Sequence, residues 1–135
     1  MNTNIAAQRA LDRLAGVGFE KLTDLDKILA IVWTFETGVG NRGFAGYFSS
    51  SAGDIAFHAP SGLRVIGAVG KAEIAARANN VFGAGGPPRD RKKRRAIVRT
   101  FNDETQKMLQ GLETLFCESQ EDVDDPREVY LDRSP

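Results

Sequence analysis

Residues with strongly reactive side chains are sparse in this chain of 135 residues. It contains one histidine, His58, and one cysteine, Cys117. A metal site of the usual nitrogen and sulfur type needs several such ligands, and a cysteine nucleophile needs an activating base beside it. The sequence therefore predicts no metal site, no cofactor and no catalytic residue. It favours a structural or surface His58, and a buried, inert Cys117 on the apolar stripe of Leu115 and Phe116.

Basic residues are concentrated in one segment, although the formal net charge of the chain is zero. Residues 89–101 contain seven basic residues and one acid. Such a run could neutralise several phosphates and bind nucleic acid weakly, whatever its base sequence. We prefer the simpler interpretation, in which the run begins a helix and pairs with the acidic tail of the same molecule. The candidate basic surface consists of Arg89, Arg91, Lys92, Lys93, Arg94, Arg95 and Arg99.

Acidic residues are concentrated near the C-terminus, where residues 102–135 contain ten acids and three bases. General acid–base catalysis needs a shielded pair of carboxylates with perturbed pKa values. A solvated acidic run is more typical of a solubilising or partner-binding segment. The acidic C-terminal segment, residues 118–135, is therefore the candidate surface for a basic protein. Its candidate residues are Glu118, Glu121, Asp122, Asp124, Asp125 and Glu128.

Helix signals dominate the elements that must position these residues, whereas strand signals are poor. We expect a first helix over about residues 5–14. Thr23 and Asp26 form a capping box that opens a second helix near Leu25, apolar on almost every side. Gly38 and Gly40 are expected to end this central helix.

Further helices are expected over about residues 54–67, 71–82 and 90–117. Pro60 should kink or restart the first of these, and the last should break near Asn102 and Asp103. Asp125, Pro126 and Glu128 give the pattern of a last short helix.

The predicted fold class is all-α, with one compact domain over residues 1–135 and six to eight helices around a central apolar helix. The longest apolar run, Ile28 to Trp33, is far shorter than the roughly 20 residues that span a bilayer. The first residues lack the layout of a secretory signal, so we expect a cytoplasmic protein without a membrane partner. The sequence specifies no oligomeric state.

The stretch NRGFAGYFSSSAGD, residues 41–54, places three aromatic residues among glycines and serines. Phe44, Tyr47 and Phe48 recur at helical spacing, which predicts a short helix with one buried face. Glycines allow a positive φ at the turn before it. Asn41 can bond local backbone, Ser51 and Asp54 can cap the next helix, and Glu36 can accept hydrogen bonds from the amides of the turn. We prefer this structural interpretation to a ligand site.

This stretch, with residues 66–68 after it, resembles the signature of the DNA-mimic protein family, a small all-helical domain. The resemblance extends from about residue 25 to residue 129. Arg42, Gly46 and Ser50 depart from it, because the family pattern has glycine, glutamine and asparagine there. A family binding site built from those side chains would be lost in this chain. The matching residues are Glu36, Asn41, Gly43, Phe44, Tyr47, Phe48, Ser51, Gly53 and Asp54.

We expect a non-enzymatic protein that binds another macromolecule, with a protein as the preferred partner. The resemblance implies DNA mimicry, in which an acidic surface imitates DNA phosphates and occupies a DNA-binding protein. Only the C-terminal segment could supply that field in a chain of zero net charge. Weak, non-specific nucleic-acid binding through residues 89–99 is one alternative, and an enzyme of unknown reaction is another.

Overall fold

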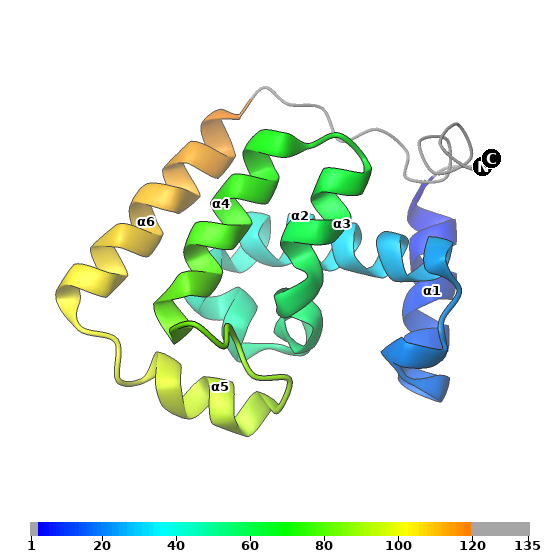
Figure 1. Ribbon diagram of the computed structural model, residues 1–135, viewed down its shortest axis with the longest axis horizontal. Helices are drawn as coiled ribbons and strands as arrows, with labels where there is room; N and C mark the ends of the chain where they lie inside the picture. The colour runs from blue at the N-terminus through cyan, green and yellow to red at the C-terminus, as the bar shows by residue number, and fades with distance from the viewer. Residues whose placement is uncertain (1–2, 120–135) are drawn as a thin grey trace.

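The computed structural model describes residues 3–119, which contain helices and no strand, so the predicted all-α class is confirmed (Figure 1). The predicted last helix at Asp125 to Glu128 lies outside the described residues. In chain order the elements are α1 (Thr3–Val17), the 3₁₀ helix η1 (Phe19–Lys21), α2 (Asp24–Ser49), η2 (Ser51–His58), α3 (Ala59–Val65), α4 (Val69–Asn79), η3 (Asn80–Phe82), α5 (Arg91–Val98) and α6 (Asp103–Glu118).

Helix α2 is the predicted central helix, and it contacts α1, α3, α5 and α6. Its N-terminus is capped by Thr23, whose hydroxyl accepts a hydrogen bond from the Asp26 amide at 3.1 Å. The other half of the predicted capping box, a hydrogen bond from the Thr23 amide to the Asp26 carboxylate, is wrong. The Asp26 carboxylate instead accepts a hydrogen bond from Arg13 Nη1 at 2.6 Å, which ties α1 to α2.

The central helix does not end at Gly38 and Gly40, as the sequence suggested. It continues to Gly43, where φ 70° and ψ 179° interrupt it, and then resumes as far as Ser49. A glycine inside a helix costs only about 1 kcal/mol relative to alanine, so it does not by itself end one. Gly38 has a packing role, since a Cβ atom there would lie 2.7 Å from Tyr47 Cδ1.

The remaining boundaries follow from local residue chemistry. Pro60 stands in the first turn of α3, directly after η2, so the predicted restart of the helix at this proline is confirmed. Asp90 caps α5 by accepting from the Lys93 amide, and Asn102 caps α6 by accepting from the Thr105 amide. The predicted break near Asn102 is therefore confirmed.

Most buried apolar side chains belong to one cluster that joins α2, η2, α3, α4 and α6. Helices α4 and α6 lie side by side on one face of the molecule, and α5 crosses below them (Figure 1). No helix among residues 3–119 is long and apolar enough to span a bilayer.

Candidate functional site

The short helical segment Phe44–Ser49, after the kink in α2, carries the three aromatic side chains of the signature stretch. Phe44 and Phe48 are fully buried and Tyr47 is 1% exposed. The rings of Phe44 and Tyr47 lie 6.2 and 5.8 Å from the ring of Phe35, in the first part of α2. The predicted single buried face is therefore confirmed, and two of its rings pack against the first part of α2.

Glu113 of α6, which the sequence interpretation missed, binds the kink. Its Oε1 accepts a hydrogen bond from the Phe44 amide at 2.7 Å. This amide opens the segment after Gly43, where a helix leaves its first N–H groups without internal partners. Glu113 lies between Leu112 and Phe116, on the apolar side of α6. A carboxylate in that position is the signal that could have identified it.

Glu36 does not accept hydrogen bonds from the turn, contrary to the expectation. Its Oε1 accepts from Lys71 Nζ of α4 at 2.8 Å, and this lysine is almost buried. The pair joins α2 to α4. Asn41 is exposed on α2. Gly53 is required by close packing, since a Cβ atom there would lie 2.6 Å from the Tyr47 carbonyl oxygen.

Arg94 of α5 is the centre of the site, and it is completely buried rather than part of a basic surface. All five N–H donors of its guanidinium bond oxygen atoms within the protein. Nε donates to the Phe48 carbonyl at 2.8 Å, and Nη1 donates to the carbonyls of Pro88 and Arg89. Nη2 donates to the Ser50 carbonyl at 2.9 Å and to Asp54 Oδ1 at 2.6 Å.

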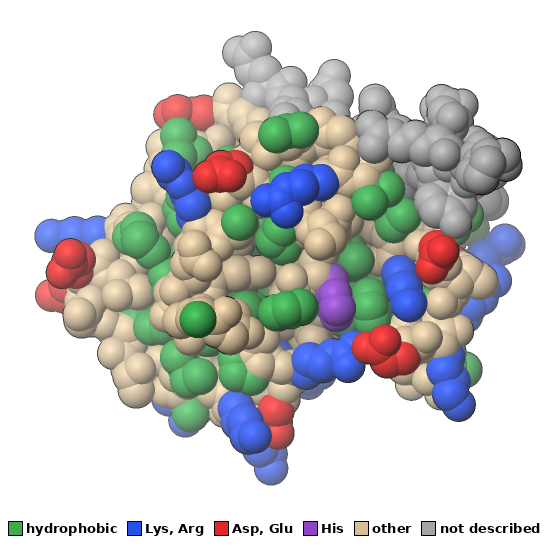
Figure 2. Space-filling model, viewed as in Figure 1, with side chains coloured by type: hydrophobic (Ala, Val, Ile, Leu, Met, Phe, Trp, Pro, Cys, Tyr) green, Lys and Arg blue, Asp and Glu red, His purple; other side chains and the backbone are tan. Residues whose placement is uncertain are grey.

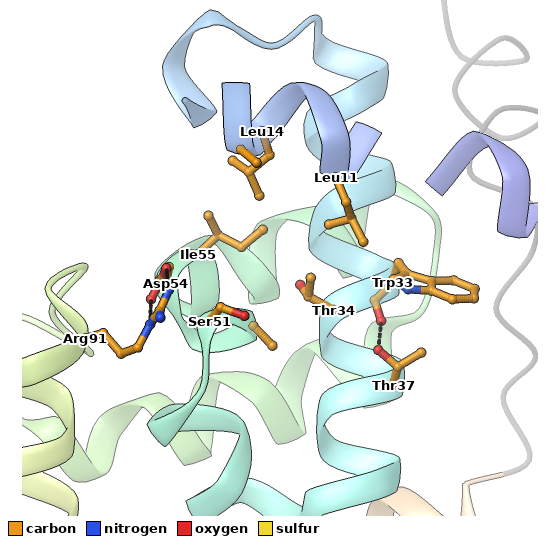
Figure 3. A pocket seen from close by; sticks show the side chains of 11 residues that line it. Leu11, Leu14, Trp33, Thr34, Thr37, Ser51, Asp54, Ile55 and Arg91 are labelled. Carbon is orange, nitrogen blue, oxygen red and sulfur yellow. Dashed lines mark hydrogen bonds and ion pairs between the residues drawn. The ribbon is translucent and has the colours of Figure 1, made fainter. Parts of the chain in front are cut away.

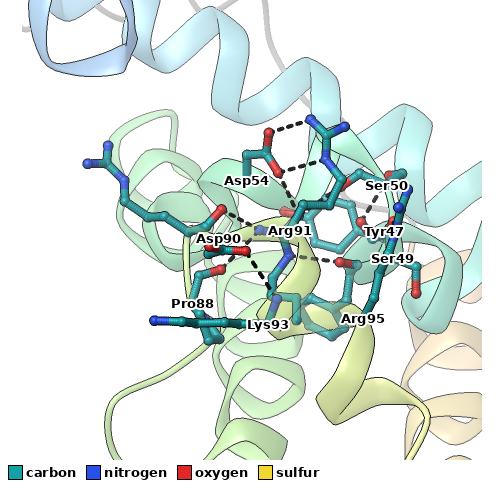
Figure 4. Close-up of polar contacts among 12 residues, drawn as sticks. Tyr47, Ser49, Ser50, Asp54, Pro88, Asp90, Arg91, Lys93 and Arg95 are labelled. Atoms are coloured by element: carbon teal, nitrogen blue, oxygen red, sulfur yellow. Dashed lines mark hydrogen bonds and ion pairs between the residues drawn. The ribbon is translucent and has the colours of Figure 1, made fainter.

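Asp54 bridges Arg94 and Arg91, so the prediction that it caps a helix is wrong. Figure 4 shows Asp54 beside Arg91. It lies inside η2, and Ser51 does not cap that helix either. Burial acts to raise the pKa of Asp54, but hydrogen bonds and charge from Arg91 and Arg94 outweigh it and lower the pKa. Asp54 therefore stays ionised and neutralises part of the arginine charge.

Other members of the basic run also have partners inside the protein. Arg89 Nη2 lies 2.7 Å from Glu20, and Arg95 Nε donates to the Ser49 carbonyl at 2.7 Å. The run therefore packs on the signature stretch, an arrangement that its sequence did not predict. Lys92 and Lys93 of α5 are exposed, and so is Arg99, which directly follows this helix.

Two departures from the family pattern lie against each other. A Cβ atom at position 46 would lie 2.6 Å from Arg42 Cβ, so the presence of Gly46 makes room for the Arg42 side chain. The third departure, Ser50, donates its hydroxyl to the Tyr47 carbonyl at 3.0 Å and so closes the end of α2. The three residues thus form local contacts within the stretch.

Cys117 is exposed, so the prediction of a buried thiol is wrong. The buried face of α6 consists of Leu109, Leu112 and Phe116, and helical spacing turns position 117 away from it. His58 stacks on Phe19, with ring centroids 4.5 Å apart. Burial lowers the pKa of His58, and the nearby charge of Arg89 lowers it further. No group of three potential metal ligands gathers within residues 3–119.

Charge is distributed unevenly between the described residues and the rest of the chain. Residues 3–119 contain 16 basic and 12 acidic residues, which gives a formal charge of +4, and residues 120–135 carry −4. Figure 2 shows basic and acidic side chains interspersed on one face, without a continuous acidic field. Glu118 is exposed at the end of α6, and the other candidate acids, Glu121 to Glu128, lie outside the described residues.

Comparison with protein families gives one result that bears on this arrangement. A family model described as DMP19-like protein matches residues 20–134, which include the signature stretch, the basic run and most of the acidic segment. The match begins after α1. No curated protein and no solved structure matches the chain.

Proposed function

Because the chain belongs to the DMP19-like protein family, a family of DNA mimics, we propose that it is a non-enzymatic protein that binds a basic protein partner. The partner is a DNA-binding protein, and the acidic C-terminal segment, residues 118–135, supplies the negative charge that takes the place of DNA phosphates. The family itself supports a protein-binding role of the DNA-mimic type and names no partner.

The observation that carries this proposal is the internal pairing of the basic run. Arg94 and Arg91 bond Asp54, and Arg89 pairs with Glu20. These arginines therefore have partners other than the acidic segment. The sequence had favoured pairing of the basic run with that segment. The carboxylates from Glu118 to Glu128 can then face a second protein.

The proposed chemistry is electrostatic. Duplex DNA carries about one negative charge per 1.7 Å of its axis, and a DNA-binding protein answers this density with lysines and arginines. Six carboxylates between residues 118 and 128 offer the same groups a comparable set of acceptors. Complementary charge accelerates association and makes the affinity dependent on salt. The complex should therefore weaken as salt rises, and duplex DNA should compete for the same partner.

The experiment uses the immobilised full-length chain to retain proteins from a nuclease-treated extract of the source cell. We expect a DNA-binding protein that free duplex DNA releases. A variant with E121Q, D122N, D124N and D125N should retain much less of it. The matched control, D12N, D24N, E73Q and E104Q, removes the same charge from exposed positions of the described residues. Equal retention by both variants would contradict the proposal.

Weak, direct binding of nucleic acid is a second candidate. Two observations favour it: Lys92, Lys93 and Arg99 are exposed, and residues 3–119 carry a formal charge of +4. The full-length chain should bind DNA no tighter than about the micromolar range of non-specific complexes at physiological salt. Deletion of residues 118–135 should strengthen that binding and steepen its salt dependence, once circular dichroism shows that both proteins are folded. Tight binding by the full-length chain, weakened by each of K92Q, K93Q and R99Q, would replace the mimic by a nucleic-acid-binding protein.

A further inference from the structure

A pocket of about 440 Å³ opens between α1, α2 and η2. Leu11 and Leu14 of α1 form one wall, and they face Ile55 of η2 across the pocket (Figure 3). Trp33 of α2 also lines it. Pockets of this volume with mostly apolar walls and a few polar groups are typical of sites for small molecules.

The polar groups lie together at one edge, where Ser51, Asp54 and Arg91 line the pocket (Figure 3). The Asp54 carboxylate forms ion pairs with two guanidinium groups, those of Arg91 and Arg94, so these three side chains carry a net charge of +1. Arg94 is fully buried, whereas the Arg91 side chain is 42% exposed. The pairing with Asp54 uses Nε and Nη2 of Arg91, and its Nη1 group lies outside that pair. The edge is therefore suited to an anion.

The opposite wall offers no competing donor from its hydroxyl groups. Thr34 donates its proton to the Ala30 carbonyl at 2.7 Å, and Thr37 donates to the Trp33 carbonyl at 2.8 Å. Both protons are used within α2. A ligand anion is therefore directed to the charge of Arg91 and to the Ser51 hydroxyl rather than to these threonines, and its apolar part to Leu11, Leu14 and Ile55.

We propose that this pocket binds a small monoanion with an apolar tail, of the class of medium-chain alkanoates. The carboxylate of the ligand accepts hydrogen bonds from Arg91 and from the Ser51 hydroxyl, and the alkyl chain packs between α1 and η2. The site needs α1, which lies before the residues that the family model matches. It uses none of the acidic residues 118–128, so the test of this site is independent of the test of the proposed function.

The chain provides its own probe, because Trp33 is its single tryptophan and lines the pocket. Titration of the full-length protein with hexanoate and octanoate should change the tryptophan fluorescence in a saturable way. Each added methylene should tighten binding about fourfold, as expected for burial of one apolar CH₂ group. Octylammonium should bind at least tenfold more weakly than octanoate, because its charge is repelled by Arg91 (an order-of-magnitude expectation for one charged hydrogen-bonding group).

Variants locate the site. R91Q should weaken octanoate about tenfold or more, whereas R95Q, which removes a charge from the same helix outside the pocket, should leave it unchanged. A15L should weaken octanoate binding without any change of charge, because Ala15 lines the pocket and a leucine there would occupy part of its volume. Ala15 is exposed, so this substitution leaves the core unchanged. Absence of saturation by either alkanoate, or equal binding of octanoate and octylammonium, would overturn the proposal. An equal loss in R91Q and R95Q would also overturn it.

Discussion

At the scale of single residues, a buried arginine satisfies its five donors by bonding four backbone carbonyls and one carboxylate. Arg94 does this with residues 40 to 46 positions away, as well as with the turn before α5. The same guanidinium therefore positions the end of α2, η2 and α5 together. A lysine has one point charge and three donors, so it cannot replace this planar group.

We therefore expect R94K to lower the free energy of unfolding by about 2–5 kcal/mol, because the three donors of lysine leave at least two of these five oxygens unpaired and each such buried group costs about 1–3 kcal/mol. The matched control is R95K, whose side chain is exposed, and which should change the free energy by less than about 0.5 kcal/mol. Urea unfolding followed by circular dichroism measures both. A loss below about 1 kcal/mol in R94K would show that a lysine can satisfy the same oxygens.

Tyr47 presents the opposite case, because its buried hydroxyl has no hydrogen-bond partner among the described residues. Burial raises the pKa of this hydroxyl, and the charge of Arg94 acts weakly against it. Y47F should raise the free energy of unfolding by about 1 kcal/mol, since it removes an unsatisfied polar group and keeps the ring. F44A should lower it by about 3–5 kcal/mol, as a large-to-small change in the core. A clear loss of stability in Y47F would mean that the hydroxyl is bonded.

At the scale of elements, the kink in α2 depends on α6. Gly43 has a positive φ, and a Cβ atom there would lie 2.6 Å from Glu113 Oε1. This combination of φ 70° and ψ 179° is essentially confined to glycine and costs another residue about 1–3 kcal/mol, and the displaced carboxylate would also lose its hydrogen bond to Phe44. We therefore expect G43A to lower the free energy of unfolding by at least that amount.

The matched control for the kink is G111A, in the middle of α6. No atom lies within 4 Å of a Cβ built at Gly111, and its φ is not positive. Alanine should therefore stabilise the helix by up to about 1 kcal/mol. Thermal unfolding of the two variants should shift the midpoint in opposite directions. An unchanged or raised midpoint in G43A would show that the geometry of Gly43 is not needed for the fold.

At the scale of the whole molecule, stability should fall as the solution is acidified. The pKa of His58 is lowered in the folded protein, first by burial and then by Arg89, so the unfolded chain binds this proton more strongly. The contribution of neutral His58 is present above its ordinary pKa of about 6.5 and is lost as pH falls through the lower, folded value. Asp54 acts in the same direction at more acidic pH, because its folded pKa is also lowered.

The measurement is the free energy of unfolding between pH 7 and pH 5 for the natural chain and for H58F. Phenylalanine preserves the stacking on Phe19 and does not titrate, so H58F should lose less stability over this interval. The control is R64Q, which removes a charge from α3 and leaves His58 in place. It should lose as much stability between pH 7 and pH 5 as the natural chain. Parallel curves for H58F and the natural chain would exclude His58 as the titrating group.

The sequence by itself determined the fold class, the central helix, the buried face of Phe44, Tyr47 and Phe48, and the boundaries at Pro60 and Asn102. These features depend on helical spacing, capping and proline geometry, which act over three or four residues. The family resemblance inferred from the signature stretch is confirmed as well, since the family model matches residues 20–134.

Tertiary structure alone decided which charged groups meet. Glu113 binds the amide of Phe44 across 69 positions, Lys71 pairs with Glu36 across 35, and Arg94 bonds Asp54 across 40. Helical spacing states which face of a helix is apolar, but it does not state which neighbour covers that face. Burial then forces each enclosed donor to find an oxygen, because an unpaired buried polar group costs about 1–3 kcal/mol. Arg94 can lie inside the protein because each of its five donors has an oxygen partner there. Its sequence neighbours Lys92, Lys93 and Arg95 are exposed.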